Sequence, residues 1–300
     1  MTTKSPASRV ALAAALSGLV LAGCLHNLSP EESTYHDLRA ALTFHASFNH
    51  GPDADFALGD RYLYHTTSSP NGRSAARRGL HTNNAIVIAR NEGPFGDALR
   101  FTRKQAPLIF FQAAQNLAYR TNDWSGTVSF WLSVDPVTEL EDGFCDPIQI
   151  TPRAWNDAAF FVEFEKRQEI PLRLGVYANY KVWNPSNRKW DDIPFNEKPL
   201  VTVAQPPFAA RKWTQVVFTF EHFNTGQADG VARLYLDGKF QGALSGRQQT
   251  FTWDETKATI MLGVGYVGLF DELSLFNRAL NEREIQTLNK LPGGVSMLPR

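Results

Sequence analysis

The stretch from Gly263 to Leu288, GVGYVGLFDELSLFNRALNEREIQTL, constrains the fold of this chain more than any other. Its first half alternates between two faces as a β-strand does, and one face would carry Leu269, Asp271, Leu273 and Leu275. The other face would carry Phe270, Glu272, Ser274 and Phe276. The pattern predicts a core-facing strand in which one carboxylate, that of Asp271, stands in line with leucines.

The second half of this stretch predicts a short helix with clear signals at both ends. Asn281 can cap the first turn, and Glu284 stands at the capping-box position. Leu280 and Ile285 have the spacing of a hydrophobic staple, and the sequence Leu-Pro-Gly at 291–293 ends the helix. We therefore expect a closing strand that leads into one short C-terminal helix.

Alternating apolar residues predict short strands through most of the remaining chain. The clearest runs from Gly126 to Val134, and Asp237-Gly238 is a strong hairpin signal because a type I′ turn needs positive φ at both central positions. Two long loops are expected at 53–79 and 177–207. The other predicted strands lie at 42–48, 85–89, 98–101, 108–111, 160–165, 172–176, 213–220, 231–236, 239–244 and 260–264. Short strands at this spacing predict an all-β sandwich.

The end of the chain resembles the closing element of laminin-G-like domains. That element reads Gly-x-hydrophobic-Asp-Glu-hydrophobic-x-hydrophobic-(Phe/Tyr)-x-Arg-x-Leu-x-x-x-Glu-Ile, and the matching residues are Gly268, Asp271, Glu272, Phe276, Arg278, Leu280, Glu284 and Ile285. The segments 129–132, 212–217 and 234–238 also follow the order of that family. The resemblance implies a concanavalin A-like jelly-roll sandwich of two antiparallel sheets, with the first strand beside the last.

The composition is compatible with one large domain. Of 300 residues, 43% are hydrophobic and 12% aromatic, which is enough for one continuous core. We place the laminin-G-like domain at 38–291 and a C-terminal tail at 292–300. Lysine plus arginine and aspartate plus glutamate both number 30, and this balance, without basic runs, argues against a nucleic-acid partner.

The first residues have the pattern of a lipoprotein signal peptide, which we place at 1–23. A basic start is followed by an apolar run at 10–22, and Leu21-Ala22-Gly23-Cys24 resembles a bacterial lipobox. The resemblance implies a lipid on Cys24, a flexible spacer at 24–37 and a membrane anchor in the cell envelope. Leu25 is not Asp, which by the same resemblance implies the outer membrane of a two-membrane cell. A plain signal peptide that happens to end in Gly-Cys is the alternative.

Catalytic motifs are absent from the sequence: there is no Gly-x-Ser-x-Gly elbow, His-Glu-x-x-His helix or Walker loop. Glu163 and Glu165 alternate onto one strand face, but the Glu-x-Asp-x-x-Glu pattern of related hydrolases is missing, so a solvated face is expected. Cys145 has no adjacent base, and a small buried apolar residue is the preferred interpretation.

Asp271 needs a partner if it stands on a core face, because a buried carboxylate without one costs several kcal/mol. Laminin-G-like domains often hold a calcium ion near this aspartate, together with the Asp of a Phe-Asp-Gly motif on the first strand. This chain has Phe48-Asn49-His50-Gly51 there, so one charge is missing. Two hypotheses for Asp271 remain open. One is a calcium ion held by Asp271 and Asn49, and the other is a metal-free, hydrogen-bonded carboxylate.

One loop has the composition of a sugar-binding rim, since aromatic faces stack on sugars and amides or carboxylates take hydroxyls. Its candidate ligand-binding residues are Tyr180, Trp183, Asn184, Trp190 and Asp191. The alternative is that these aromatics form a secondary core. We expect an envelope binding or adhesion module for a glycan or an envelope protein; a glycan-active hydrolase of the same superfamily is the other hypothesis.

Overall fold

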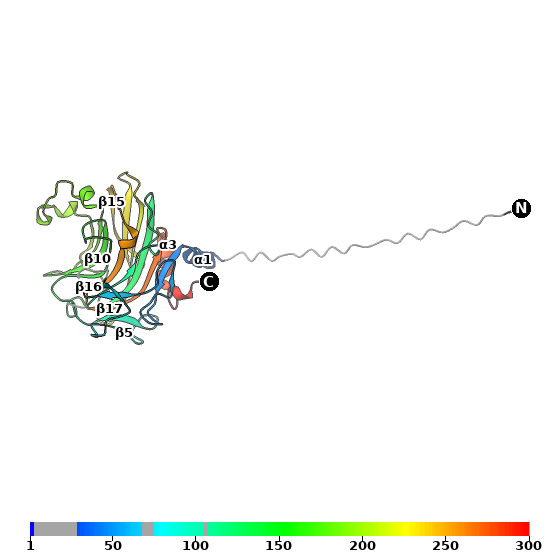
Figure 1. Cartoon of the computed structure of the whole chain (residues 1–300), viewed down its shortest axis with the longest axis horizontal. Helices are drawn as coiled ribbons and strands as arrows, with labels where there is room; N and C mark the ends of the chain where they lie inside the picture. Colours follow the sequence, from blue (N-terminus) through cyan, green and yellow to red (C-terminus); the bar gives the residue numbers. More distant parts are fainter. Residues whose placement is uncertain (3–28, 68–74, 105–106, 300) are drawn as a thin grey trace.

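Two antiparallel sheets packed face to face make up most of the molecule. The computed structural model describes residues 1–2, 29–67, 75–104 and 107–299. In Figure 1 one sheet, with β10 and β16, lies on one side, the sheet with β15 and β17 lies in the middle, and helices α1 and α3 lie beyond it. The prediction of a two-sheet antiparallel sandwich is confirmed.

The first sheet, called sheet A here, carries the closing strand at its centre. Every strand pairing in it is antiparallel, and β6 and β5 extend it beside β17. Its order is β15 (Lys239–Arg247), β14 (Gly230–Leu236), β13 (Trp213–Phe223), β8 (Trp124–Ser133), β17 (Gly268–Phe276), β1 (Leu42–Ala46) and β2 (Phe56–Ala57), with β6 at Ala98–Phe101 and β5 at Ile86–Ala89.

The second sheet, sheet B, holds the middle of the chain. Its order is β12 (Leu200–Val203), β11 (Leu172–Tyr177), β10 (Ala159–Lys166), β9 (Gly143–Thr151), β16 (Thr259–Val264), β7 (Leu108–Gln112), β3 (Tyr64–Thr66) and β4 (Arg77–Arg78). The helices are α1 (Pro30–Ala41), α2 (Tyr180–Trp183) and α3 (Glu282–Lys290), with short 3-10 turns at Trp190–Asp192, Phe195–Glu197, Glu255–Lys257 and Val295–Met297.

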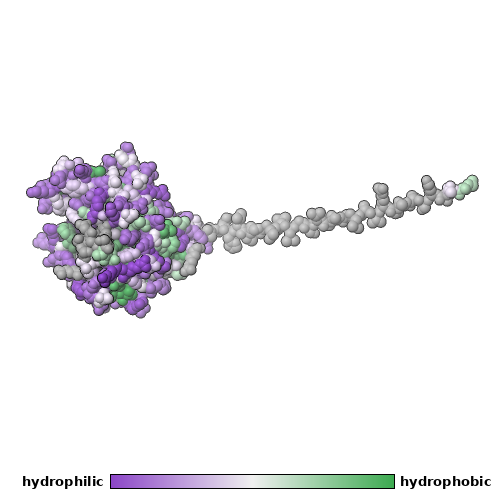
Figure 2. All heavy atoms as spheres, viewed as in Figure 1, coloured by the Kyte–Doolittle hydropathy of each residue, from purple (hydrophilic) through white to green (hydrophobic). Residues whose placement is uncertain are grey.

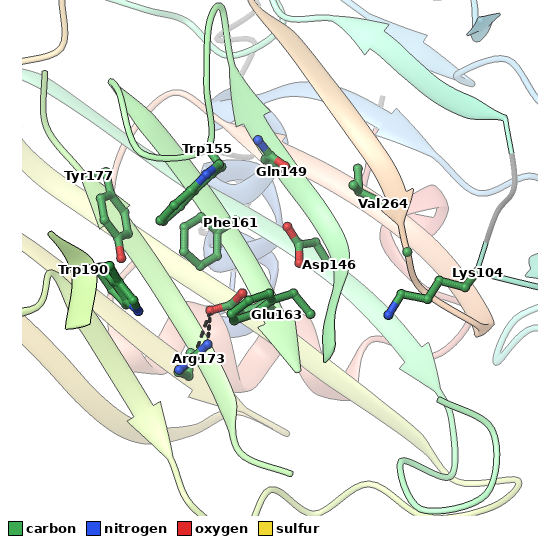
Figure 3. Close-up of a pocket in the computed structure, with 12 residues that line it drawn as sticks. Lys104, Asp146, Gln149, Trp155, Phe161, Glu163, Arg173, Tyr177, Trp190 and Val264 are labelled. Atoms are coloured by element: carbon green, nitrogen blue, oxygen red, sulfur yellow. Dashed lines mark hydrogen bonds and ion pairs between the residues drawn. The ribbon is translucent and has the colours of Figure 1, made fainter. Parts of the chain in front are cut away.

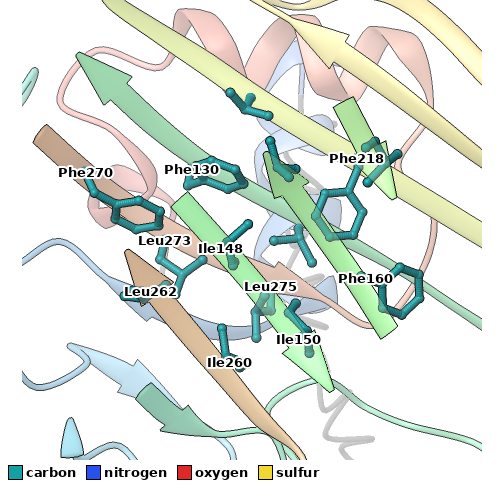
Figure 4. Close-up of a cluster of buried hydrophobic side chains, with 14 of the residues drawn as sticks. Phe130, Ile148, Ile150, Phe160, Phe218, Ile260, Leu262, Phe270, Leu273 and Leu275 are labelled. Atoms are coloured by element: carbon teal, nitrogen blue, oxygen red, sulfur yellow. The ribbon is translucent and has the colours of Figure 1, made fainter. Parts of the chain in front are cut away.

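The main core lies between the two sheets. Strand alternation turns one side chain in two inward, so that aromatic and branched residues of both sheets meet (Figure 4). The fully buried residues of this layer include Phe130, Phe218, Phe270, Ile148, Ile150, Phe160 and Ile260. Burying such side chains stabilises the fold by roughly 1.5–3 kcal/mol each.

A second apolar cluster lies on the outer face of sheet A. Leu38 of α1 and Ile285 of α3 pack there against Val217, Tyr235 and Phe276 of the sheet. The expected flexible spacer at 24–37 is therefore wrong from residue 30 onward, where the chain is helical. Ser29 and Glu32 form a capping box with Pro30 in the first turn, a start signal that our sequence analysis overlooked.

The predicted neighbours β1 and β17 do pair, but the closing strand contains an extra residue. Asp271 stands opposite Trp131 and Ser274 opposite Ser129, so three steps on β17 match two on β8. Glu272 has φ of 55°, as a β-bulge requires. The bulge changes the alternation: Phe270, Leu273 and Leu275 face the core, and Asp271 does not stand in line with them. The predicted assignment of faces is wrong before the bulge and right after it.

Several local predictions are confirmed, and some strands were missed. Asp237 and Gly238 have φ of 49° and 72°, as the predicted type I′ hairpin requires. Strand β9 was missed because Pro147 interrupts its pattern; the register of β9 on β10 shifts at this point, and a bulge tolerates proline. Strands β3 and β12 lie within the segments predicted as loops.

The last described residues are packed on sheet A rather than forming a free tail. Val295 and Leu298 are buried in the second cluster, and the Val295 N–H donates to Glu272 Oε2 at 3.1 Å. Where residues are described, no helix has the length and apolar character needed to cross a membrane. The face seen in Figure 2 is mostly hydrophilic, with small separate apolar areas.

Candidate ligand-binding site

A pocket of about 530 Å³ opens on the outer face of sheet B. Strands β9, β10 and β11 form its floor, and four segments outside these strands complete its walls (Figure 3). Its lining residues are Lys104, Phe144, Asp146, Gln149, Trp155, Phe161, Glu163, Arg173, Tyr177, Trp190, Val264 and Gly265. Pockets of this size hold ligands of a few rings.

Strand alternation supplies the floor. Phe160 and Val162 of β10 face the core. Because side chains alternate along a strand, Phe161 and Glu163 face outward into the pocket. Gly175 of β11 pairs directly with Phe161, and a Cβ on Gly175 would stand 2.5 Å from Phe161 Cε1. The absence of that Cβ lets the Phe161 ring lie flat along the sheet, which gives the pocket an apolar base.

Aromatic rings form the walls. Trp155, from the turn between β9 and β10, is 45% exposed and stands nearly perpendicular to two other rings. Its centroid lies 5.6 Å from that of Tyr177 and 5.9 Å from that of Trp190. Figure 3 shows these rings around one opening, with Phe161 beneath. Exposed tryptophan faces of this kind are suited to stack on a flat, partly apolar ligand.

Glu163 and Arg173 form a buried ion pair on the floor. Arg173 Nε donates to Glu163 Oε1 at 2.9 Å, and Arg173 Nη1 donates to Glu165 Oε2 at 2.5 Å. Burial raises the pKa of Glu163 to about 7, although the nearby Arg173 opposes this shift. The predicted solvated face is therefore wrong for Glu163, which is only 6% exposed. The surrounding aromatic walls are what exclude solvent from it.

Asp146 is the unusual group in this pocket. Its carboxyl is 9% exposed and makes no hydrogen bond or ion pair with another described residue. Burial, followed by the neighbouring charge of Glu163, raises its pKa well above the usual range. This environment favours the neutral form of Asp146, which can both donate and accept a hydrogen bond.

Other polar groups in the pocket also lack partners among the described residues. The Tyr177 hydroxyl is buried without a hydrogen bond, and the Gln149 side-chain amide, 8% exposed, makes none either. Buried polar groups are nearly always hydrogen-bonded, so several unpaired ones around one cavity indicate a ligand or water that completes them. The sequence missed this site because its residues come from separate segments.

The five predicted rim residues have different positions. Trp190 lines the pocket, and Asp191 follows it in an exposed 3-10 turn. Trp183 packs edge-on against Tyr177 at 5.0 Å and donates its Nε1–H to Asn156. Asn184 is buried and bonds Arg188 and Tyr180, which do not line the pocket. The loop thus provides one pocket wall and otherwise a small secondary core.

Asp271, the predicted calcium ligand, is buried on the outer face of sheet A beneath the 91–97 loop. The Glu272 N–H donates to its Oδ1 at 2.8 Å, and Oδ2 has no partner among the described residues. A Cβ on Gly93 would stand 2.5 Å from Oδ2 and closer still to the carbonyl oxygen of Asp97. Burial, then the charge of Glu272, raises the pKa of Asp271 to about 9. Oδ2 and the Asp97 carbonyl therefore face each other across Gly93, and a proton or a cation between them would be favourable.

Asn49, the second predicted ligand, lies at the same loop, but another group uses its oxygen. The Asp97 N–H donates to Asn49 Oδ1 at 2.7 Å. Across the described part of the chain, no three His, Cys, Asp or Glu side chains group as metal ligands do. The donor set here is one carboxylate oxygen, one amide oxygen and a carbonyl, which is poor in charge for calcium. A proton on Asp271 satisfies the same geometry.

Two cysteines were assigned roles from the sequence. Cys145 is fully buried on the core side of β9, and burial raises its pKa to about 11, as expected of an inert thiol. Cys24, the predicted lipidation site, lies outside the described residues, as does the rest of the proposed signal peptide.

The two-sheet antiparallel sandwich has the architecture of a concanavalin A-like domain. Residues 110–286 match the Laminin_G_3 family model, described as the concanavalin A-like lectin/glucanases superfamily. The chain belongs to this family, which confirms the resemblance seen in the closing strand. Among the curated proteins, none matches the sequence.

Solved structures share the fold at low sequence identity. One is domain 4 of AbnA, a GH43 extracellular arabinanase from Geobacillus stearothermophilus, in complex with arabinotriose. The two structures superpose with a TM-score of 0.52 and 16% sequence identity, and the match covers 83% of this chain and 98% of that chain. Another is the receptor binding domain of botulinum neurotoxin mosaic serotype C/D. Here the TM-score is 0.50 and the sequence identity 11%, and the match covers 84% of this chain and 51% of that chain.

Proposed function

We propose that this protein is a carbohydrate-binding module of the cell envelope and that its pocket on sheet B holds a saccharide. The observation that carries the proposal is the combination of the exposed Trp155 ring and the half-buried Trp190 ring with unpaired polar groups at one opening. Sugars present apolar C–H faces and many hydroxyls, and they need both kinds of partner. The arabinotriose bound by the arabinanase domain is a precedent on the same fold.

The experiment is a glycan array probed with the full chain in detergent, followed by titration calorimetry on the hits. Trp155→Ala and Trp190→Ala should each lower affinity about tenfold, because stacking contributes on the order of 1 kcal/mol or more. Phe195→Ala is the matched control, since Phe195 is 60% exposed and does not line the pocket. Equal losses in all three variants, or none, would contradict the proposal.

The alternative, a glycan-active hydrolase, gains one observation, because the pocket holds two carboxyl groups with raised pKa values. Hydrolysis needs one carboxyl as acid and another as nucleophile or base. Glu163 Oε1, however, accepts a hydrogen bond from Arg173 Nε and forms an ion pair with Arg173 Nη2 at 2.7 Å. We propose binding without cleavage; release of reducing ends from a bound glycan, abolished by Glu163→Gln, would favour the hydrolase.

The proposal also includes the membrane anchor and the outer-membrane location expected from Cys24 and Leu25. Their support is the sequence pattern at 4–24. The anchor would hold the binding module at the surface where envelope glycans or envelope proteins are found. Its test is given in the Discussion.

A further inference from the structure

The two carboxyl groups on the pocket floor differ in their partners. Arg173 contacts two carboxylates, Glu163 Oε1 at 2.7 Å and Glu165 Oε2 at 2.5 Å, so its positive charge is already shared. Asp146 is a third carboxyl beside them and has no partner among the described residues. Figure 3 shows Asp146 next to Glu163, with the Arg173 bonds on the far side of Glu163.

Lys104, the other cation that lines the pocket, makes its hydrogen bond outside it. Lys104 Nζ donates to the backbone oxygen of Asp142, on the rim, and its stem lies against Gly265. The pocket lining therefore has two acids and two cations, but neither Lys104 nor Arg173 forms a direct ion pair with Asp146. A buried carboxylate is stabilised by a partner cation or by strong hydrogen bonds, and Asp146 has neither among the described residues, so a ligand cation placed against it would be favourable.

The walls above Asp146 favour a cation as well. Trp155, Tyr177 and Trp190 surround the opening, and aromatic faces attract positive groups through the ring quadrupole. The Trp190 ring already takes part in one such contact, since Lys198 Nζ lies 4.1 Å from its centroid. An acid below and aromatic faces around it are the arrangement that recognises an ammonium group.

We propose that the pocket selects an amino sugar, whose protonated amine lies against Asp146 within the rings of Trp155, Tyr177 and Trp190. This rests on the proposed saccharide binding and adds the chemical class of the ligand. The sugar's C–H face stacks on tryptophan, its hydroxyls bond Gln149 and the Tyr177 hydroxyl, and its amine supplies the ion-pair partner that Asp146 lacks. N-acetylation removes that charge and enlarges the group.

The test compares matched free-amine and N-acetylated oligomers of glucosamine and of galactosamine, at a pH about one unit below the pKa of the amine. In titration calorimetry the parent should bind one free-amine series at least about tenfold more tightly than its acetylated partner, as expected for a hydrogen bond between charged groups. Asp146→Asn keeps the shape and removes the charge, so the ratio should fall to about one. Phe195→Ala, outside the pocket, is the matched control and should leave the preference in place.

The outcomes separate the two proposals. Equal binding of both forms, or tighter binding of the acetylated form, would overturn the amine preference and leave saccharide binding intact. Binding of neither form, with no neutral glycan retained on the array, would overturn both. If Asp146→Asn does not fold, Trp155→Leu is the second variant, because Trp155 is partly exposed and its loss should reduce the same ratio. A ratio unchanged by Trp155→Leu would count against the proposal.

Discussion

Buried acids outside the main core are the most informative single residues of this protein. Asp146 and Glu163 lie on the outer face of sheet B, and Asp271 and Glu272 lie on the outer face of sheet A. Burial raises the pKa of each, to about 9 for Asp271 and to about 7 for Glu163 and for Glu272. Acids of this kind are stable as neutral groups, so stability and binding should both depend on pH.

The first prediction concerns Asp271 and pH. Its folded pKa lies far above its unfolded value, so its contribution is complete below pH 4 and is lost as the pH rises toward 9. The parent should lose up to about 1.4 kcal/mol of unfolding free energy per pH unit across that range through this group. Asp271→Asn should remove this slope and be more stable than the parent at pH 8.5, whereas Asp271→Ala should lose a few kcal/mol at neutral pH.

Urea unfolding at several pH values measures these slopes, and calcium decides between a proton and a cation on Asp271. If Asp271 carries only a proton, millimolar calcium and chelator leave the melting midpoints of the parent and of Asp271→Asn unchanged. A calcium-dependent rise in the parent, absent from Asp271→Asn and enlarged in Asn49→Asp, would instead establish a metal site. Parallel pH slopes in parent and Asp271→Asn would contradict the buried, protonated carboxyl.

At the scale of elements, two short features set the geometry described above. Helix α1 adds a layer to sheet A through its capped first turn, and Gly175 of β11 leaves room for the Phe161 ring on sheet B. Each feature depends on one small residue: Ser29 caps α1, and Gly175 leaves the space beside Phe161. Substitutions there should therefore give defined effects rather than general loss of folding.

We expect Ser29→Ala to destabilise the protein by about 1 kcal/mol, because the first backbone N–H groups of α1 lose their cap. Ser33→Ala, at an exposed position inside the same helix, should be neutral or slightly stabilising. Thermal melting of the two variants beside the parent measures the difference. If Ser29→Ala has the same melting temperature as the parent, α1 does not unfold as part of the cooperative unit.

Gly175→Ala should push the Phe161 ring off the pocket floor. The cost is about 1–3 kcal/mol of overpacking strain, together with weaker saccharide binding because the ring enters the pocket. The double variant Phe161→Leu with Gly175→Ala should recover most of the lost stability, and Phe161→Leu alone is its reference. Melting and binding data that show no coupling between the two positions would contradict this packing.

Sequence reasoning found the sandwich because strand alternation and turn chemistry are local. It placed the pair β1 and β17 correctly, through a family pattern, but missed the bulge at Glu272. The pocket was mostly missed because its residues meet only after β9, β10 and β11 have paired. One local signal was present: Phe160 and Phe161 are both large and apolar, which indicates that β10 is covered on both faces.

At the scale of the whole molecule, the proposed lipid on Cys24 gives the fourth prediction. Cys24→Ser should release the protein from envelope membranes into the soluble fraction, because the lipid would be the anchor. Fractionation after a salt wash, with the parent and Leu25→Ala as controls, measures this release. A Cys24→Ser protein that still sediments with membranes would contradict lipidation at this site.

The outer faces of the two sheets point in opposite directions, and this sets how the molecule would stand on a surface. Helix α1 and the C-terminal segment cover sheet A, while the pocket opens on sheet B (Figure 1). The six residues from Cys24 to Ser29 can span at most roughly 20 Å. A lipid on Cys24 would then keep the domain close to the bilayer with its pocket turned outward. In that orientation the pocket would be accessible to polymers on the side facing away from the bilayer, and would not contact the membrane that holds the lipid.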